Sequence, residues 1–376
     1  MIYALMFVGS LLLFNIALKF RFTNKKVFVL FSLIALVLPC FLAGVRDYSI
    51  GTDVNLYVEP LYRVSKCFSH FFDFVNMSGS EVNDYGYLFL TFICGKLSND
   101  IFLLFFLSEL LVIAPIYKSL LNMTDKTKPI LYGIFIFYMV LYNLSFNMVR
   151  QSIAIAFSIL SFTYFLKKKN LKSILSLIIA FCFHSSSIIM LTTFILSTFF
   201  ESRKSNSKDT VGLRYLIVII LILVVILFPN IIRMLINLGL LNAKHFSRLL
   251  GYYNNIDINF VRTAWYIAFY LLFLLNKGKL SKNLSNSYFY SFLSFISIII
   301  LQLGAVVQFS ERIGYYYFFI TLILGVPFMC FNNNSDNSIK RKSIINLIVI
   351  FIFFSYWFYW SIYIGSNQTY PFVFRV

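Results

Sequence analysis

The sequence predicts an all-α integral membrane protein that crosses the bilayer about ten times. Of its 376 residues, 60% are hydrophobic and only 12% are charged, whereas a soluble domain has roughly 25% charged residues. A transmembrane helix needs about 20 apolar residues, so the length allows about ten such helices and their loops. We therefore expect a single transmembrane domain over residues 1–376, and a soluble enzyme is excluded.

Ten apolar runs mark the predicted membrane-spanning helices, because long apolar stretches bounded by polar residues are typical of them. The runs lie near residues 2–20, 27–45, 101–121, 129–146, 147–166, 215–235, 262–276, 285–307, 313–331 and 343–363. Residues 85–97 are apolar but long enough for only about half a span, which predicts an interfacial helix. Residues 173–200 are too long for one upright helix and are interrupted at His184-Ser-Ser-Ser. This pattern predicts a re-entrant or short-helix pair.

The distribution of Lys and Arg predicts which loops face the cytoplasm, because cytoplasmic loops carry an excess of these residues. If the pair at 173–200 enters and leaves on the cytoplasmic side, that side carries 21 of the 32 basic residues, 17 of them Lys. A single span there would place the lysines at 277–282 outside. We therefore expect two long outward loops, at residues 46–84 and 239–261.

The predicted outward face has the composition of an anion-binding surface. Eight of its eleven basic residues are Arg, whose planar guanidinium can contact phosphate or carboxylate through two hydrogen bonds. The same face holds nine of the fourteen acidic residues. We therefore expect the ligand site, and any catalysis, on the outward side.

The first candidate motif follows the second apolar run and reads Arg46-Asp47-Tyr-Ser-Ile-Gly-Thr-Asp53, with Tyr57 one helical turn later. A carboxylate beside an Arg at the lipid boundary can orient a sugar hydroxyl or accept its proton. An ordinary loop with a helix cap and a salt bridge is the alternative, and it is favoured for this motif taken alone.

Two further motifs interrupt apolar runs. Asn147-Met-Val-Arg150-Gln151 places an Arg within a membrane protein, where it is costly unless it is paired or functional; an Arg that reaches the headgroups is an equal alternative. At His184, non-helical backbone at membrane depth indicates a cavity or burial within protein. Its imidazole could donate to a phosphate or act as an acid or base near neutral pH, or it could be a structural residue.

The fourth motif begins at Glu311-Arg312 and continues into a run that includes Tyr315 and Tyr316. The Arg suits phosphate binding, the Tyr rings suit stacking on sugar, and Glu311 is a further candidate base. An aromatic belt with an Arg that reaches the headgroups explains the same residues.

Several other function classes lack support in the sequence. There is no P-loop, GxGxxG or DxD pair, which argues against nucleotide substrates, and the five Cys form no metal-binding pattern. The basic residues are spread over short loops, so nucleic acid is not an expected partner. We see no internal repeat of the kind found in many secondary transporters. No metal and no cofactor are expected.

Taken together, these motifs resemble the EpsG-type branch of the Wzy polysaccharide polymerases. The resembling stretches are Arg46 to Asp53 with Tyr57, Asn147-xx-Arg150-Gln151-xx-Ala154, Phe183-His184-Ser-Ser, and Arg312 with its tyrosines, in family order. Tyr85-Gly-Tyr87 is a weaker match, and Asp84, separated from Gly86 by Tyr85, stands near the position of an acid that the family often has.

The resemblance implies a GT-C-like glycosyltransferase of the bacterial inner membrane whose active site faces the periplasm. Such an enzyme moves the growing glycan from undecaprenyl pyrophosphate onto a sugar hydroxyl of the next lipid-linked repeat unit, as in O-antigen synthesis. The expected partners are the undecaprenyl-pyrophosphate-linked oligosaccharide, membrane lipids and a chain-length regulator protein.

With this interpretation the expected site residues fall into three groups. The residues expected to bind pyrophosphate are Arg46, Arg150, Arg312 and Gln151. The expected base is Asp53, and the further candidates for the base are Glu311, His184 and Asp47. The residues expected to contact the sugar are Tyr57, Tyr315 and Tyr316. Two alternative functions are a lipid-linked oligosaccharide flippase or other transporter, and an O-antigen ligase that uses the same donor. The gathering of charge at one face favours an enzyme over a flippase.

Overall fold

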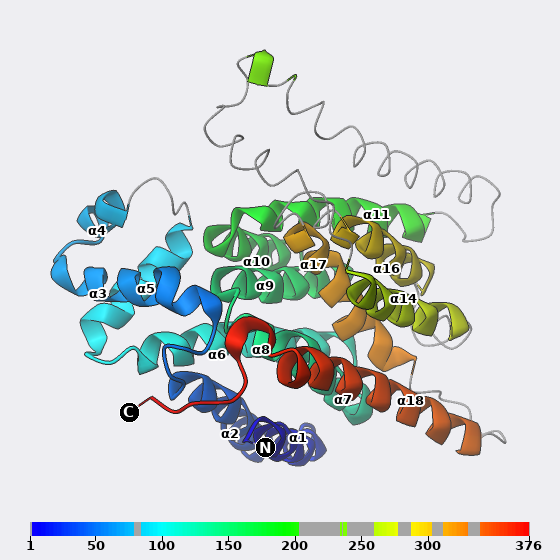
Figure 1. Ribbon diagram of the computed structural model, residues 1–376. Helices are drawn as coiled ribbons and strands as arrows, with labels where there is room; N and C mark the ends of the chain where they lie inside the picture. The colour runs from blue at the N-terminus through cyan, green and yellow to red at the C-terminus, as the bar shows by residue number, and fades with distance from the viewer. Residues whose placement is uncertain are drawn as a thin grey trace. The chain divides into compact units, whose positions relative to one another are not determined.

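The computed structural model consists of helices joined by turns (Figure 1). It describes residues 2–78, 84–202, 234, 236–238, 259–276, 287–302, 311–329 and 339–375. These ranges contain no β-strand, only one isolated β-bridge. The all-α prediction is therefore confirmed for the part of the chain that the structure describes.

The chain divides into two compact units, which we describe separately. The first consists of Met1–Met190 and Asn333–Val376, and the second of Leu191–Asn332. Among the described residues, six helices are long and apolar enough to cross a membrane, and all six belong to the first unit. This agrees with the prediction of a protein that crosses a membrane several times.

The six candidate spans coincide with six of the predicted runs. They are α1 (Ile2–Lys19), α2 (Lys25–Gly44), α6 (Phe102–Met123), Thr127–Ser145, α9 (Val149–Leu166) and Asn346–Tyr363. Thr127–Ser145 combines α7 (Thr127–Phe137), η2 (Tyr138–Tyr142) and α8 (Asn143–Ser145). Asn346–Tyr363 begins within α18 (Ile339–Trp357) and ends with η7 (Phe358–Tyr363).

The other four predicted spans lie in the second unit. The run 215–235 falls outside the described residues, apart from residue 234. The others correspond to shorter helices: α14 (Phe260–Leu275), α16 (Ser287–Leu301), and α17 (Glu311–Ile320) with η5 (Thr321–Gly325) and η6 (Val326–Phe328). The count of ten spans and the GT-C-like architecture stay predictions.

Helix α9 is the most buried of the six candidate spans. Small residues allow neighbouring helices to approach closely in a bilayer, and five on α9 are almost fully buried: Ser152, Ala154, Ala156, Ser158 and Ser161. The helices α6 and α10 (Asn170–Phe183) pack against it. Ser161 Oγ donates to the Ser173 carbonyl of α10 at 2.7 Å, and Ser173 Oγ donates back at 2.9 Å. This packing fixes the helix whose second residue is Arg150.

The stretch 46–84, predicted as an outward loop, contains helices where the structure describes it. These are η1 (Val54–Val58), α3 (Glu59–Cys67) and α4 (Phe71–Ser78). The expected helix at 85–97 is α5 (Tyr85–Leu97), and its residues Leu88 and Phe92 pack with Phe74 of α4 in a small hydrophobic cluster. Its interfacial location stays a prediction.

The predicted break at His184 is present. Helix α10 ends at Phe183, His184 is extended, the turn η3 (Ser185–Ile189) follows, and α11 (Met190–Ser202) begins after it. Whether this pair is re-entrant stays a prediction.

The C-terminal tail after η7 folds back along the end of α2 (Figure 1). Phe374 forms an antiparallel bridge with Arg46: the Asp47 amide donates to the Val373 carbonyl and the Arg375 amide to the Val45 carbonyl, both at 2.9 Å. The first and last segments of the chain are also linked, because Tyr3 OH donates to the Thr369 carbonyl at 2.6 Å.

Candidate functional site

A polar cluster forms in the first unit where several helices begin or end. Its side chains belong to Asp53, Tyr57, Asp84, Arg150 and His184. Asp84 directly precedes α5, Arg150 is the second residue of α9, and His184 follows the last residue of α10. Asp53 directly precedes η1, which contains Tyr57. Breaks between apolar helices thus bring together charged and polar residues that are far apart in the chain.

Asp84 is the centre of this polar cluster. Its Oδ2 accepts a hydrogen bond from Arg150 Nη1 at 2.8 Å and lies 3.2 Å from His184 Nδ1. The Asp84 side chain is only 7% exposed, while those of Arg150 and His184 are 22% and 25% exposed. A buried carboxylate requires such partners. Asp84 therefore contacts Arg150 and His184 on their buried sides, and the exposed part of each side chain is accessible to a ligand.

Tyr57 and Asp53 continue the cluster on the other side of Arg150. The guanidinium carbon of Arg150 lies 4.6 Å from the centre of the Tyr57 ring, a cation–π geometry. Tyr57 OH donates to Asp53 Oδ2 at 3.1 Å. Burial raises the pKa of the Tyr57 phenol, so the phenol stays protonated at neutral pH and continues to donate to Asp53.

Asn147, which precedes α9, accepts hydrogen bonds from the residues at the start of the segment that contains Asp53 and η1. Its Oδ1 accepts from the Asp53 amide at 3.0 Å and from Thr52 Oγ1. Asn147 Nδ2 donates to Asn367 Oδ1 of the C-terminal tail at 2.9 Å. The C-terminal tail is thereby connected, through Asn147, to the segment that contains Asp53 and Tyr57.

Arg46, one of the predicted pyrophosphate ligands, is buried in the structure. The residue is 2% exposed, and its guanidinium carbon lies between two rings, 4.1 Å from the centre of Phe105 and 4.3 Å from that of Phe146. Burial lowers the pKa of Arg46 to about 10, although the carboxylate of Glu109 opposes this shift. Glu109 of α6 is also buried and accepts from Ser145 Oγ at 2.7 Å. These surroundings favour a structural role for Arg46.

Of two further predicted site residues, Asp47 has hydrogen-bond partners in its own turn and Gln151 is almost fully buried. Asp47 Oδ1 accepts from the Ser49 amide at 2.9 Å and from Ser49 Oγ at 2.7 Å, and these hydrogen bonds lower the pKa of Asp47. Asp47 thus stabilises its own turn. Gln151 follows Arg150 but is only 3% exposed.

The fourth predicted motif lies in the second unit, at the start of α17. Glu311, Arg312 and Tyr315 are half-buried. Tyr316 is fully buried, which argues against a stacking contact with a sugar. The next residue, Tyr317, forms a hydrogen bond of 2.5 Å with Thr192 Oγ1. Convergence of Arg312 with Arg150 stays a prediction, because the two residues belong to different units.

Three residues matter more in the structure than the sequence indicated. Asp84 was only a displaced match to a family acid, yet it contacts both Arg150 and His184. Asn147 was part of a motif but had no assigned role. Asn367 carries no sequence signal, because its partner lies 220 residues away.

An apolar groove of about 330 Å³ begins beside the polar cluster. It lies between α5, α6 and α10, and its lining includes Gly86, two residues after Asp84, and Phe183, next to His184. The groove continues past Leu90 and Ile179 to Ile93 and Ile178. Its composition suits a hydrocarbon chain.

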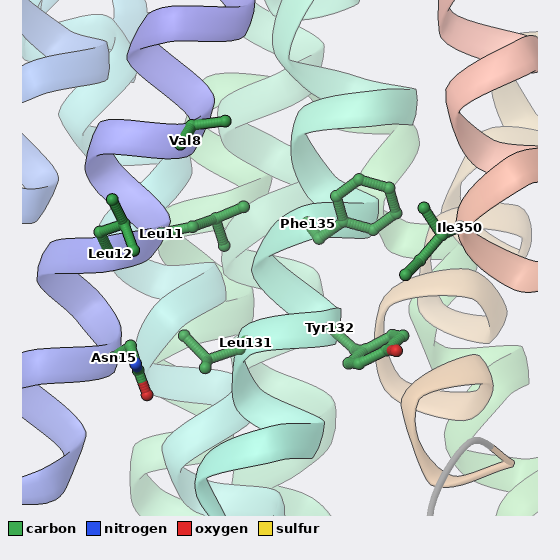
Figure 2. Close-up of a pocket in the computed structure, with 8 residues that line it drawn as sticks. All are labelled: Val8, Leu11, Leu12, Asn15, Leu131, Tyr132, Phe135 and Ile350. Atoms are coloured by element: carbon green, nitrogen blue, oxygen red, sulfur yellow. The ribbon is translucent and has the colours of Figure 1, made fainter. Parts of the chain in front are cut away.

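A second apolar pocket lies between α1, α7 and α18 (Figure 2). Its lining includes Leu12, Phe135 and Ile350 but none of the residues of the polar cluster.

The described residues contain no group of three or more His, Cys, Asp or Glu that could hold a metal ion. The polar cluster is therefore the candidate site, with a cation, an oriented imidazole and an adjacent apolar groove.

Comparison with known proteins identifies the family of the chain. Residues 28–374 match the family model of the EpsG family, which is nearly the whole sequence. Neither the curated proteins nor the solved structures gave a match. The match supports a polysaccharide polymerase function in general terms. The chain therefore belongs to the EpsG family, whose members are Wzy-like polymerases.

Proposed function

We propose that the protein is a glycosyltransferase that polymerises lipid-linked repeat units at the periplasmic side of the bacterial inner membrane. The donor is a glycan on undecaprenyl pyrophosphate, and the acceptor is a sugar hydroxyl of the next lipid-linked unit. Family membership supports a polymerase. The observation that carries the proposal is the arrangement of Arg150 and His184 on the Asp84 carboxylate.

In the proposed reaction the acceptor oxygen forms a bond to the anomeric carbon of the donor, and the bond from that carbon to pyrophosphate breaks. Arg150 stabilises the negative charge that develops on the leaving pyrophosphate. Arg312 stays a candidate for such a role on the sequence alone. Because pyrophosphate is already a good leaving group, charge and positioning suffice without a metal.

His184 is the base that the geometry favours over Asp53. Contact with Asp84 at Nδ1 fixes the orientation of the ring and its tautomer, which leaves Nε2 to accept the hydroxyl proton. Among the described residues Nε2 has no hydrogen-bond partner. Asp53 already accepts a hydrogen bond from Tyr57. Asp53 and Tyr57 are then proposed to contact the sugar and to position Arg150.

The apolar groove beside Asp84 is proposed to hold the first part of the polyprenyl chain of the donor. From Gly86 to Ile93 it follows about two turns of α5, or ~10 Å. A chain in this groove would place its pyrophosphate next to Arg150. Within a bilayer such a groove orients the donor more than it adds affinity, because surrounding lipid is equally apolar.

The test of this function is transfer between two lipid-linked repeat units by the purified protein in detergent. We expect a lipid-linked dimer and then longer products, without added metal or nucleotide. A flippase only moves its substrate across a membrane and forms no covalent bond, so it would give no products in this assay. Absence of products under conditions that keep the protein folded would therefore contradict the proposal. A ligase would transfer the glycan only to a different acceptor, such as a lipid A core.

Replacing His184 with alanine is expected to lower the rate of dimer formation by about 10²–10⁴-fold, the usual contribution of a general base. Donor binding should change little, because Arg150 remains. The measurement is the initial rate against donor concentration. His70→Ala is the matched control, since His70 is exposed. A His184→Ala rate within threefold of the wild type would show that another group is the base.

A further inference from the structure

We infer that Asn367 in the C-terminal tail is a positioning residue for the polar cluster and acts through the side-chain amide of Asn147. This inference rests on the proposed function for its catalytic consequence. Its structural basis is a continuous series of contacts. The series runs from Asn367 to Asn147, to Asp53, to Tyr57 and then to Arg150.

The helical segment that carries Tyr57 begins without a cap of its own. The first amides of a helix have no partner within the helix, and the Asp53 side chain makes no capping hydrogen bond. Asn147, 94 residues further along the chain, supplies the missing acceptor, because its Oδ1 accepts from the Asp53 amide. The same oxygen accepts from Thr52 Oγ1. The position of this segment therefore depends on which way the Asn147 amide points.

The Asp53 backbone N–H, which can only donate, sets that orientation, and Asn367 stabilises it. A side-chain amide has an acceptor oxygen at one end and a donor NH₂ group at the other. In the observed orientation Asn147 Nδ2 donates to Asn367 Oδ1 at 2.9 Å, and its oxygen faces the two donors at residues 52 and 53. A rotated amide would turn its NH₂ group towards the Asp53 N–H and lose that hydrogen bond, and it would bring its oxygen against Asn367 Oδ1. The acceptor on Asn367 therefore favours the orientation in which Asn147 caps the helix.

The tail holds Asn367 at a defined place in the first unit. Arg375 Nη2 forms an ion pair of 2.5 Å with Asp100 Oδ1, and Phe374 pairs with Arg46. Between Asn367 and these contacts, the Thr369 carbonyl accepts from Tyr3 OH. Asn367 itself has a φ of 62°, a conformation that Asn and Gly adopt more readily than other residues. The tail is thus fixed beyond Asn367, and the backbone conformation suits the residue.

The test replaces Asn367 with glycine, which tolerates the left-handed backbone conformation and removes the side chain that carries the amide. We expect kcat for dimer formation to fall about tenfold with little change in KM, because Arg150 and Tyr57 lose their alignment. Asn367→Asp keeps the acceptor and should restore most of the rate. Gln368→Ala is the matched control, because Gln368 is its exposed neighbour with a similar positive φ.

A double-mutant cycle distinguishes positioning from a general effect on folding. In an Asn147→Ala background, Asn367→Gly should have no further effect on kcat, because the two residues act in series. Additive effects, or a kcat for Asn367→Gly equal to that of the wild type, would overturn the inference.

Amide hydrogen exchange of residues 52–58 gives a readout that needs no activity. Faster exchange in Asn367→Gly than in Gln368→Ala is expected, because Asn147 loses the partner of its Nδ2 and is held less firmly as the acceptor of the Asp53 amide. If the wild-type protein makes no dimer, the proposed function fails, and this exchange difference still decides the structural part of the inference. Equal exchange in the two variants would contradict it.

Discussion

Replacing Arg150 with alanine is expected to lower the rate of polymer formation by about 10²–10³-fold, the usual effect of removing a group that stabilises developing charge. Arg150 is the partly exposed cation of the polar cluster, and Asp84 and Tyr57 hold its guanidinium from two sides. An alanine would also remove one of the two side chains that contact the buried Asp84 carboxylate and leave the contact with His184. The measurement is the initial rate of dimer formation from purified lipid-linked units in detergent.

Arg150→Lys separates charge from geometry in this prediction. A lysine keeps the positive charge but lacks the planar fork that can contact Asp84 and a phosphate at once, so we expect an intermediate loss. Arg63→Ala is the matched control, because Arg63 is 75% exposed and forms an ion pair with Glu59 on its own helix. If Arg150→Ala were as active as Arg63→Ala, the polar cluster would not be the pyrophosphate site.

The features predicted best from the sequence are those that interrupt an apolar pattern. The six candidate spans coincide with predicted runs, and the break at His184 was expected because Ser-Ser-Ser follows it. Arg150 and His184 stood out because polar residues are costly in such a context. The structure places both of them on one carboxylate.

The features that could not be predicted depend on contacts between distant residues. Arg46 and Arg150 both lie beside apolar runs, and a sequence pattern cannot show that one guanidinium turns inward between Phe105 and Phe146. Similarly, Asp84 meets Arg150 across 66 residues. Asn367 was not predicted for the same reason. Periodicity reveals which segments are helices, but the pairing of their ends is set by tertiary packing.

The roles of Arg46 and Arg150 therefore differ in a way that has a consequence for stability. Replacing Arg46 with methionine is expected to destabilise the folded protein by about 1–3 kcal/mol, the usual effect of taking a favourable partner away from a buried polar group. Glu109 would lose the compensating charge, and two Phe rings would lose a cation–π contact. The measurement is the temperature at which monodisperse protein is lost in detergent.

The double variant Arg46→Met/Glu109→Gln decides between a structural and a ligand-binding role. Removing both charges leaves no uncompensated group in the interior, so most of the lost stability should return. If Arg46 acts only within the fold, this folded double variant will also polymerise lipid-linked units at a rate close to that of the wild type. A stable but inactive double variant would instead support the pyrophosphate contact predicted from the sequence. Single Arg46→Met protein as stable as the wild type would contradict the buried-charge argument itself.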